Sequence, residues 1–291
     1  MSNQRIIIGF ADYDAPGQRL AEALRVDYRR AEVHRFPDGE CKVRIPATLP
    51  AHTIFCRSLF DPDHKLIELL LATDAARRHG ATTLTLVAPY LAYLRQDAEF
   101  TPGEAISAHT IGKLLGQTFQ HLITVDPHLH RIRALSEVLC GAHSTVVSAA
   151  SAMARHIAAR VTTPLLLGPD SESAQWVSQI AAIHGWQWAV ANKVRHDDYH
   201  VSELLPMISF ARRDVVLVDD MISTGRTAAR AAEACYQAGA ENVYCAVTHG
   251  LFSGDSARVL AAAGVREVWS SDSVPHATNA YFLAPAIAAV L

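Results

Sequence analysis

The chain has 291 residues, of which 50% are hydrophobic and 19% charged, and its formal net charge is −3. This composition is typical of a globular protein, and the net charge gives no basic surface for nucleic acid. A chain of this length can bury one large core or two ordinary ones, and two domains are favoured. The apolar run at the start, RIIIGF, is too short for a signal peptide or a membrane span. The five cysteines have no CxxC spacing, which argues against a zinc site or a disulfide framework, so we expect reduced thiols and a cytoplasmic protein.

Apolar runs that end in turns recur along the chain, separated by alanine-rich helical stretches. In chain order they are RIIIGF, TIFCRSL, TLTLVAPY, HLITVDPH, PLLLGPD, VVLVDD and VYCAVTHG. Their alternation with helical stretches, among them residues 65–80 and 105–117, predicts parallel α/β structure. HLITVDPH and VVLVDDMI both pass from apolar residues into an acid, as equivalent strands of two duplicated domains would.

Polar residues follow several of these predicted strands. Ligands bind at the carboxyl ends of strands in open parallel sheets, because the loops diverge there and helix N-termini face the crevice. The candidate site residues on this ground are Arg95, Gln96, Asp97, His128, Asp170, Asp219 and Asp220.

The stretch 214–227, DVVLVDDMISTGRT, carries the most specific chemistry. Residues 215–218 read as a strand buried on both faces, and residues 223–227 read as a loop that feeds the N-terminus of an alanine-rich helix. Such a loop offers backbone N–H groups and hydroxyls to an anion, whereas Asp219 and Asp220 would repel it unless they met hydroxyl groups or a metal. A sugar phosphate supplies both needs, and the alternative is an ordinary strand, turn and helix.

This stretch resembles the phosphoribosyl pyrophosphate motif of type I phosphoribosyltransferases and ribose-phosphate pyrophosphokinases. The segment FPDGE at 36–40 is similar to the FxDGE element of the pyrophosphokinases, and YLAYLRQDAEFTPGEAIS at 90–107 matches the same family at nearly every fixed position. THGLFSG and the final SVPHATNAYFLAPAIAAVL also match, so the resemblance covers almost the whole chain.

The resemblance implies an α/β fold of two tandem type I phosphoribosyltransferase-like domains, each with a mainly parallel sheet flanked by helices. Residues 1–146 would form the ATP side and residues 147–291 the ribose 5-phosphate side, and the last helix could return to pack on the first domain. It also implies an enzyme, a ribose-phosphate diphosphokinase, that transfers the diphosphoryl group of MgATP to the anomeric hydroxyl of ribose 5-phosphate and yields phosphoribosyl pyrophosphate and AMP.

The family's residue roles carry over position by position. Lys193 and Arg195 would be catalytic, and His128 and Asp170 would hold Mg²⁺. The resemblance assigns ATP binding to Phe36, Asp38, Gly39, Glu40, Arg95 and Gln96, and ribose 5-phosphate binding to Arg195, Asp219, Asp220, Ser223, Thr224, Gly225, Arg226 and Thr227. Since FPDGE reaches into a neighbouring subunit in the family, we expect a homo-oligomer with a shared nucleotide site, and neither nucleic acid nor a membrane as a partner.

Some alternatives stay open at this point. A phosphoribosyltransferase would share the 5-phosphate loop without needing FPDGE or RQD, and a non-catalytic regulatory paralogue would keep the fold. By itself FPDGE is a solvated turn, and a lone histidine after a strand is usually structural. The chain also departs from the family at Ser223, where many members carry an acid, at Arg226, where a small residue is common, and at Ser171 to Ser173, SES, where glycines are usual.

Overall fold

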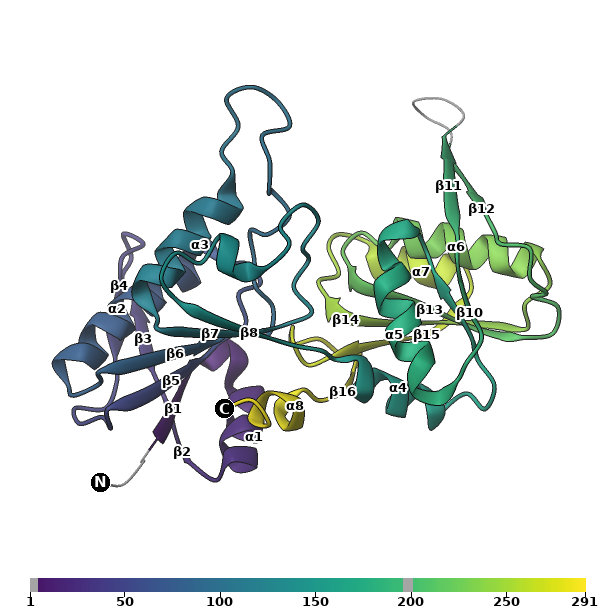
Figure 1. Ribbon diagram of the computed structural model, residues 1–291. Coiled ribbons are helices and arrows are strands. Elements are labelled where there is room, and N and C mark those ends of the chain that lie inside the picture. Colours follow the sequence, from purple (N-terminus) through teal and green to yellow (C-terminus); the bar gives the residue numbers. More distant parts are fainter. Residues whose placement is uncertain (1–4, 196–200) are drawn as a thin grey trace. The chain divides into compact units, whose positions relative to one another are not determined.

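The computed structural model describes residues 5–195 and 201–291, and for residues 192–195 and 201–204 it describes the backbone alone. The chain forms two compact units (Figure 1): residues 1–147 together with 284–291, and residues 148–283. The expected domains are 1–146 and 147–291, and the assignment of residues 284–291 to the first unit agrees with the expectation that the last helix can return to the first domain. This helix, α8, Ala284–Ala288, packs on α1, Asp14–Leu24, of the first unit.

The first unit is built on a six-stranded parallel sheet with the order β2-β1-β5-β6-β7-β8. Its strands are β1 Arg5–Gly9, β2 Asp27–Arg30, β5 His52–Cys56, β6 Thr83–Val87, β7 His121–Val125 and β8 His143–Val147. Its helices are η1 Ala11–Tyr13, α1, α2 Asp63–Arg78, α3 Ser107–Thr118, η2 Leu135–Glu137 and α8. A separate antiparallel hairpin, β3 Glu32–Arg35 with β4 Cys41–Arg44, follows β2.

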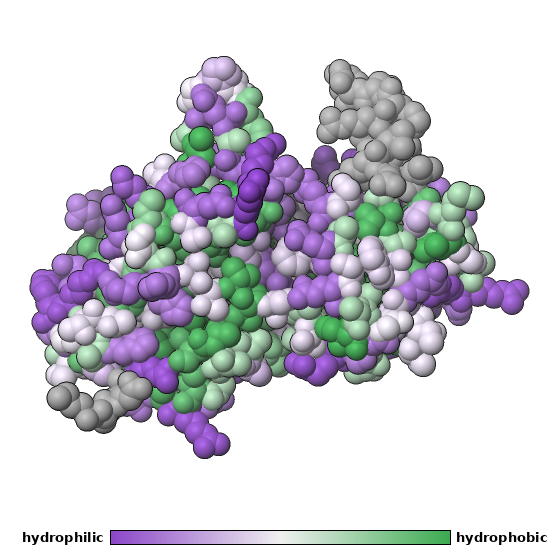
Figure 2. All heavy atoms as spheres, in the orientation of Figure 1, coloured by the Kyte–Doolittle hydropathy of each residue, from purple (hydrophilic) through white to green (hydrophobic). Residues whose placement is uncertain are grey.

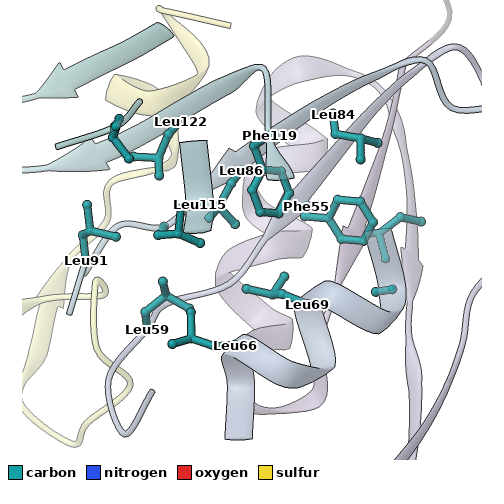
Figure 3. Packing of buried hydrophobic residues seen from close by; sticks show 14 of the residues in the cluster. Phe55, Leu59, Leu66, Leu69, Leu84, Leu86, Leu91, Leu115, Phe119 and Leu122 are labelled. Carbon is teal, nitrogen blue, oxygen red and sulfur yellow. The ribbon is translucent and has the colours of Figure 1, made fainter. Parts of the chain in front are cut away.

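Both faces of this sheet are buried, as the continuous apolar runs predict. Alternate residues of the central strands face α2 and α3 and form one hydrophobic cluster with them. Figure 3 shows its centre, where Leu66 and Leu69 of α2 lie among strand residues and Phe55 meets Phe119 edge-on with ring centroids 6.1 Å apart. Because α2 is fixed to this cluster, its buried polar residues Lys65 and Glu68 are held in place with it.

The second unit contains a six-stranded parallel sheet with the order β10-β9-β13-β14-β15-β16. Its strands are β9 Leu165–Gly168, β10 Trp188–Val190, β13 Asp214–Ile222, β14 Asn242–Gly250, β15 Val265–Ser271 and β16 Asn279–Tyr281. Its helices are α4 Ala150–Ala158, η3 Ser171–Ser173, α5 Ala174–His184, α6 Arg226–Gln237 and α7 Ser256–Ala262. The hairpin β11 Asn192–Arg195 with β12 Val201–Leu204 follows β10. The alanines of α6 pack with one face of the central strands, and α4 and α5 also pack on the sheet.

The predicted fold class is confirmed, because each unit has a parallel sheet flanked by helices. In both sheets the second strand in chain order lies at an edge beside the first, and the third to sixth strands follow in order on the other side. The sequence pair HLITVDPH and VVLVDDMI is therefore not an equivalent pair, since β7 is the fifth strand of its sheet and β13 is the third of the other. The equivalent of β13 is β5, because each is the third strand of its sheet in chain order and pairs with the first strand on the side away from the edge.

Two helix boundaries differ from those that the sequence predicts. The first predicted helix begins two residues earlier, at Asp63, because Pro62 has a φ of −84° that suits a helix start and the acid at position 63 interacts favourably with the helix dipole. The second runs from Ser107 to Thr118 rather than over 105–117.

The molecular surface in Figure 2 is mostly hydrophilic or neutral, with apolar residues gathered in smaller areas. Across the described part of the chain, no helix combines the length and hydrophobicity needed to cross a bilayer.

Candidate active site

The loop that links β13 to α6 has the geometry of an anion site. Gly225 precedes the first residue of α6 with a φ of +73°, a left-handed conformation that glycine adopts at little cost. A side chain there would also be crowded, because an added Cβ would lie 3.1 Å from Cγ of Leu260 on α7. The helix that follows has 12 residues, so its first N–H groups and its dipole face whatever this loop holds.

A second segment holds this loop in place. The backbone N–H of Phe252 donates to the carbonyl of Ile222 at 3.2 Å, and that of Ser253 donates to the carbonyl of Ser223 at 3.0 Å. The Ser223 and Ser253 hydroxyls are also 3.1 Å apart. The Phe252 ring stacks on His276 at a centroid distance of 4.2 Å, which anchors the segment in turn. Ser223 is therefore tied into a hydrogen-bonded pair of loops.

Two acids of the second unit act on a third, Asp219. Burial raises the pKa of Asp219 well above its ordinary value, and the negative charges of Asp220 and Asp170 raise it further. Asp170 also caps η3, since its carboxylate accepts from the backbone N–H of Glu172 at 3.2 Å. Gly168 lies behind this turn, where an added Cβ would be 2.2 Å from the Ser173 hydroxyl oxygen. The SES segment is therefore built into a short capped helix, and the three acids form a region that favours cations or hydroxyl donors.

The segment 36–40 forms the tight turn between β3 and β4. The backbone N–H of Gly39 donates to the carbonyl of Phe36 at 3.0 Å, and the N–H of Glu40 donates to the carboxylate of Asp38 at 3.1 Å. The Phe36 side chain is 40% exposed and touches the ring of His34 edge-on. The turn is confirmed, and it leaves an aromatic ring available for stacking.

The segment 95–104 folds around one glutamate. A Glu104 carboxylate oxygen accepts from the Gln96 amide and from the backbone N–H groups of Phe100 and Thr101, each at 3.1 Å. Arg95 is exposed. The side chain of Gln96 is thus oriented by a residue eight positions further along.

Asp97, also in this segment, is buried and joins the segment to the loop after β7. Its carboxylate accepts from the backbone N–H of Arg131 at 2.7 Å and from its guanidinium at 2.9 Å. That guanidinium also lies over the Phe100 ring at 5.0 Å. His128, partly buried, lies in the loop that Asp97 holds.

The remaining candidates are placed in part. His128 belongs to the first unit and Asp170 to the second. Among the described residues, no three histidine, cysteine or acidic side chains form a set that could hold a metal ion by themselves. Lys193 and Arg195 lie in the strand β11, where they pair with Glu203 and Val201 of β12. Their side chains lie outside the described part of the chain.

Comparisons with known proteins match both units. A family model for the N-terminal domain of ribose phosphate pyrophosphokinase matches residues 6–118, and one for the phosphoribosyl synthetase-associated domain matches residues 208–284. A ribose-phosphate pyrophosphokinase of Methanopyrus kandleri is 34% identical over 94% of this chain and 93% of its own length. The chain belongs to the ribose-phosphate pyrophosphokinase family. A relative of that name from Methanosarcina acetivorans is 32% identical over 98% of both chains.

The fold of the family is found over the full chain. The crystal structure of phosphoribosylpyrophosphate synthetase from Mycobacterium smegmatis superposes with a TM-score of 0.84, at 23% identity, over 99% of this chain and 97% of that one. The expected phosphoribosyltransferase-like architecture of this pyrophosphokinase family member is therefore confirmed.

Sequence reasoning did not find the residues that support the candidate site. Gln96 is held by Glu104, Asp97 by Arg131, and Ser223 by Ser253. Glu104 lies within the matched stretch YLAYLRQDAEFTPGEAIS, which was the one signal available for it. Ser253 likewise lies within the matched stretch THGLFSG. The contacts of Arg131 and Ser253 join residues 34 and 30 positions apart, and no local pattern in a single sequence indicates such contacts.

Proposed function

We propose that this chain is a ribose-phosphate pyrophosphokinase. The anomeric hydroxyl of ribose 5-phosphate attacks the β-phosphorus of MgATP and loses its proton, the bond between that phosphorus and the α-phosphate oxygen breaks, and phosphoribosyl pyrophosphate and AMP form. Similarity to pyrophosphokinases over nearly the whole length of both units carries this conclusion. The free cysteines accord with the cytoplasmic location that we also propose.

The first unit supplies the ATP side of the proposed site. Phe36 offers an exposed ring for the adenine, and Asp38 and Glu40 lie in the same turn. The exposed Arg95 offers a planar cation that can stack on a base and contact a phosphate, and Gln96 is oriented beside it by Glu104. Gly39 allows the turn, because its φ of +95° is a conformation that other residues rarely adopt.

The second unit supplies the ribose 5-phosphate side. The loop at Ser223, Thr224 and Gly225 and the first turn of α6 at Arg226 and Thr227 would bind the 5-phosphate through N–H groups, hydroxyls and the helix dipole. The carboxylates of Asp219 and Asp220 would accept hydrogen bonds from the ribose hydroxyls. The raised pKa of Asp219 supports this role, since a hydroxyl donor or a cation relieves the crowding of negative charge.

Of the two residues proposed to hold Mg²⁺, Asp170 suits the ion better than His128 does. Magnesium prefers oxygen ligands, and Asp170 adds its carboxylate to the acids already near Asp219. His128 would add one imidazole nitrogen or act through a water molecule. When bound, the ion supplies charge neutralisation on the diphosphoryl group.

Positioning and charge stabilisation would account for catalysis, because phosphoryl-group transfer needs little covalent help from a protein. Lys193 and Arg195 would neutralise charge that develops on the transferred group, and Arg195 would also contact ribose 5-phosphate. Both belong to a two-stranded hairpin that is not hydrogen-bonded to the sheet. A cation carried on such a separate element can reach the substrate after it has bound.

The test of this function is direct. The purified chain is incubated with MgATP and ribose 5-phosphate, and AMP and phosphoribosyl pyrophosphate are measured. Equal amounts of both products are expected. A phosphoribosyltransferase would instead consume phosphoribosyl pyrophosphate with a nucleobase, and a regulatory paralogue would form no product under either condition.

A homo-oligomer with a nucleotide site shared between subunits is the second part of the proposal. It predicts that inactive Phe36→Ala/Asp38→Ala subunits and inactive Lys193→Ala subunits regain activity when they exchange. Mixed oligomers are verified by native mass spectrometry. If verified mixtures stay inactive, the 36–40 turn either acts within its own chain or serves only as a turn.

A further inference from the structure

A buried charge network lies in the first unit and involves none of the side chains proposed to bind substrate. At its centre Glu68 of α2 is 1% exposed, and its two carboxylate oxygens meet two different guanidinium groups. Arg57 lies 2.7 Å from one oxygen, and Arg35 pairs with the other. A carboxylate buried to this degree is stable only when it is paired, so both arginines matter to it.

The Arg57 side of the network is fixed by several other contacts. Its Nε donates to Asp12 at 3.0 Å, and its guanidinium lies over the Phe10 ring at 4.2 Å. Lys65 of α2 also donates to Asp12, at 2.8 Å. Glu68 is therefore a rigid acceptor, held by the helix that carries it and by Arg57.

The Arg35 side reaches the hairpin that carries the FPDGE turn. Arg35 is the last residue of β3, directly before Phe36, and its own side chain is half-exposed. In the described part of the chain the hairpin forms a two-stranded sheet of its own, and its Val33 and Val43 pack against the hydrophobic cluster of the unit. An isolated two-stranded hairpin is marginally stable in water, so its orientation depends on its contacts with the rest of the unit. Besides packing of α2 on β4, the Arg35–Glu68 pair is such a contact.

We propose that Glu68, acting through Arg35, is a positioning residue for ATP: it fixes the 36–40 turn to α2 so that Phe36 is oriented before the nucleotide arrives. The inference rests on the proposed function, in which that turn binds ATP. Preorganisation of a binding loop improves affinity because less ordering remains to be done on binding.

The experiment compares two arginines of the same hairpin. Arg35→Met breaks the pair with Glu68 while leaving the Arg57–Glu68 and Arg57–Asp12 pairs in place. Arg44→Met is the matched control, since Arg44 pairs with Glu32 at 2.6 Å on the same hairpin but both side chains are well exposed. We expect Arg35→Met to raise the KM for ATP about tenfold with little change in kcat or in the KM for ribose 5-phosphate. Arg44→Met should leave all three parameters near those of the unaltered protein.

Hydrogen exchange without nucleotide separates positioning from direct contact and does not depend on activity. In Arg35→Met the amide N–H groups of Phe36 and Gly39, which close the turn, should exchange several-fold faster than in the unaltered protein and in Arg44→Met. Faster exchange with an unchanged KM for ATP would show that the Arg35–Glu68 pair holds the turn, but it would overturn the proposed role of the pair in ATP binding. A raised KM for ATP with unchanged exchange would mean that Arg35 touches the nucleotide itself, and it would overturn the proposal. If the unaltered protein forms no AMP, the proposed function fails, whereas the exchange result still decides whether Glu68 and Arg35 hold the turn.

Discussion

Replacing Asp97 with asparagine tests whether one buried carboxylate holds together two loops of the proposed ATP side. Asp97 is 1% exposed at its side chain and accepts two hydrogen bonds from Arg131, one from the backbone and one from the guanidinium. Asp97→Asn keeps the shape and one acceptor oxygen, but removes the charge and turns the other oxygen into a donor. The Arg131 side chain then loses its partner.

The magnitude follows from those contacts. A hydrogen bond to a charged group contributes about 1.5–3 kcal/mol. Asparagine retains one of the two bonds, and Arg131, which is 51% exposed, can be solvated instead. We therefore expect the free energy of unfolding to fall by about 1–2 kcal/mol, which corresponds to a decrease in Tm of roughly 3–6 °C for a unit of this size. The KM for ATP should also rise severalfold, because one loop carries Arg95 and Gln96, proposed to contact the nucleotide, and the other carries His128, proposed to contact its Mg²⁺.

The Asp97–Arg131 pair should also make the stability of the protein depend on pH. Burial tends to raise the pKa of Asp97, but the hydrogen bonds and the positive charge of Arg131 outweigh it and hold the pKa below its ordinary value. A carboxyl whose pKa is lowered on folding stabilises the fold at pH values above its unfolded pKa of about 3.9. This stabilisation is lost as the pH falls through the lower, folded value. The Tm difference between the unaltered protein and Asp97→Asn should therefore be full at pH 7 and shrink below pH about 4.

Thermal unfolding followed by circular dichroism from pH 3 to pH 7, together with ATP kinetics at pH 7, checks both expectations. The matched control is Asp74→Asn on α2, where the carboxylate lies 2.8 Å from Arg78 but both side chains are about 70% exposed. Its effect should stay within about 0.5 kcal/mol, as for other exposed pairs. The reasoning is refuted if the two variants melt alike at pH 7, or if the deficit of Asp97→Asn persists undiminished at pH 3.

Three further expectations concern the second unit. In calorimetric titrations Asp220→Asn and Thr227→Ala should weaken ribose 5-phosphate binding more than ATP binding, and the reverse order would mean that the two sides are wrongly assigned. Gly225→Ala should weaken ribose 5-phosphate binding and lower Tm more than Gly185→Ala. Both glycines have positive φ values, but only Gly225 has heavy atoms within 4 Å of an added Cβ. Equal effects would mean that only the backbone cost of about 1–2 kcal/mol matters at both positions. Lys193→Ala should lower kcat roughly a hundredfold or more while ribose 5-phosphate still binds, and near-normal turnover with saturating substrates would exclude it from catalysis.

The sequence by itself determined the class of fold and the local geometry of the candidate site. Apolar runs such as VVLV at 215–218 are buried on both faces, which only a sheet covered by helices allows. The turn at 36–40 and the loop before α6 were also predictable, because each depends on a glycine with positive φ that lies within the motif. These features arise from residues close to one another in the chain.

The tertiary structure alone decided which strands are equivalent and what supports the site. Two apolar runs ending in an acid looked alike in sequence, yet their places in the two sheets differ, because sheet order depends on pairing between distant strands. The Glu68 network is of the same kind: its partners Arg35 and Arg57 come from β3 and from the residue after β5, and in sequence Glu68 is one more charged residue in a helix. Burial turned that charge into a structural requirement, since a carboxylate removed from water must find partners wherever the fold brings them. Asp97 and Arg131, 34 positions apart, were joined by the same rule.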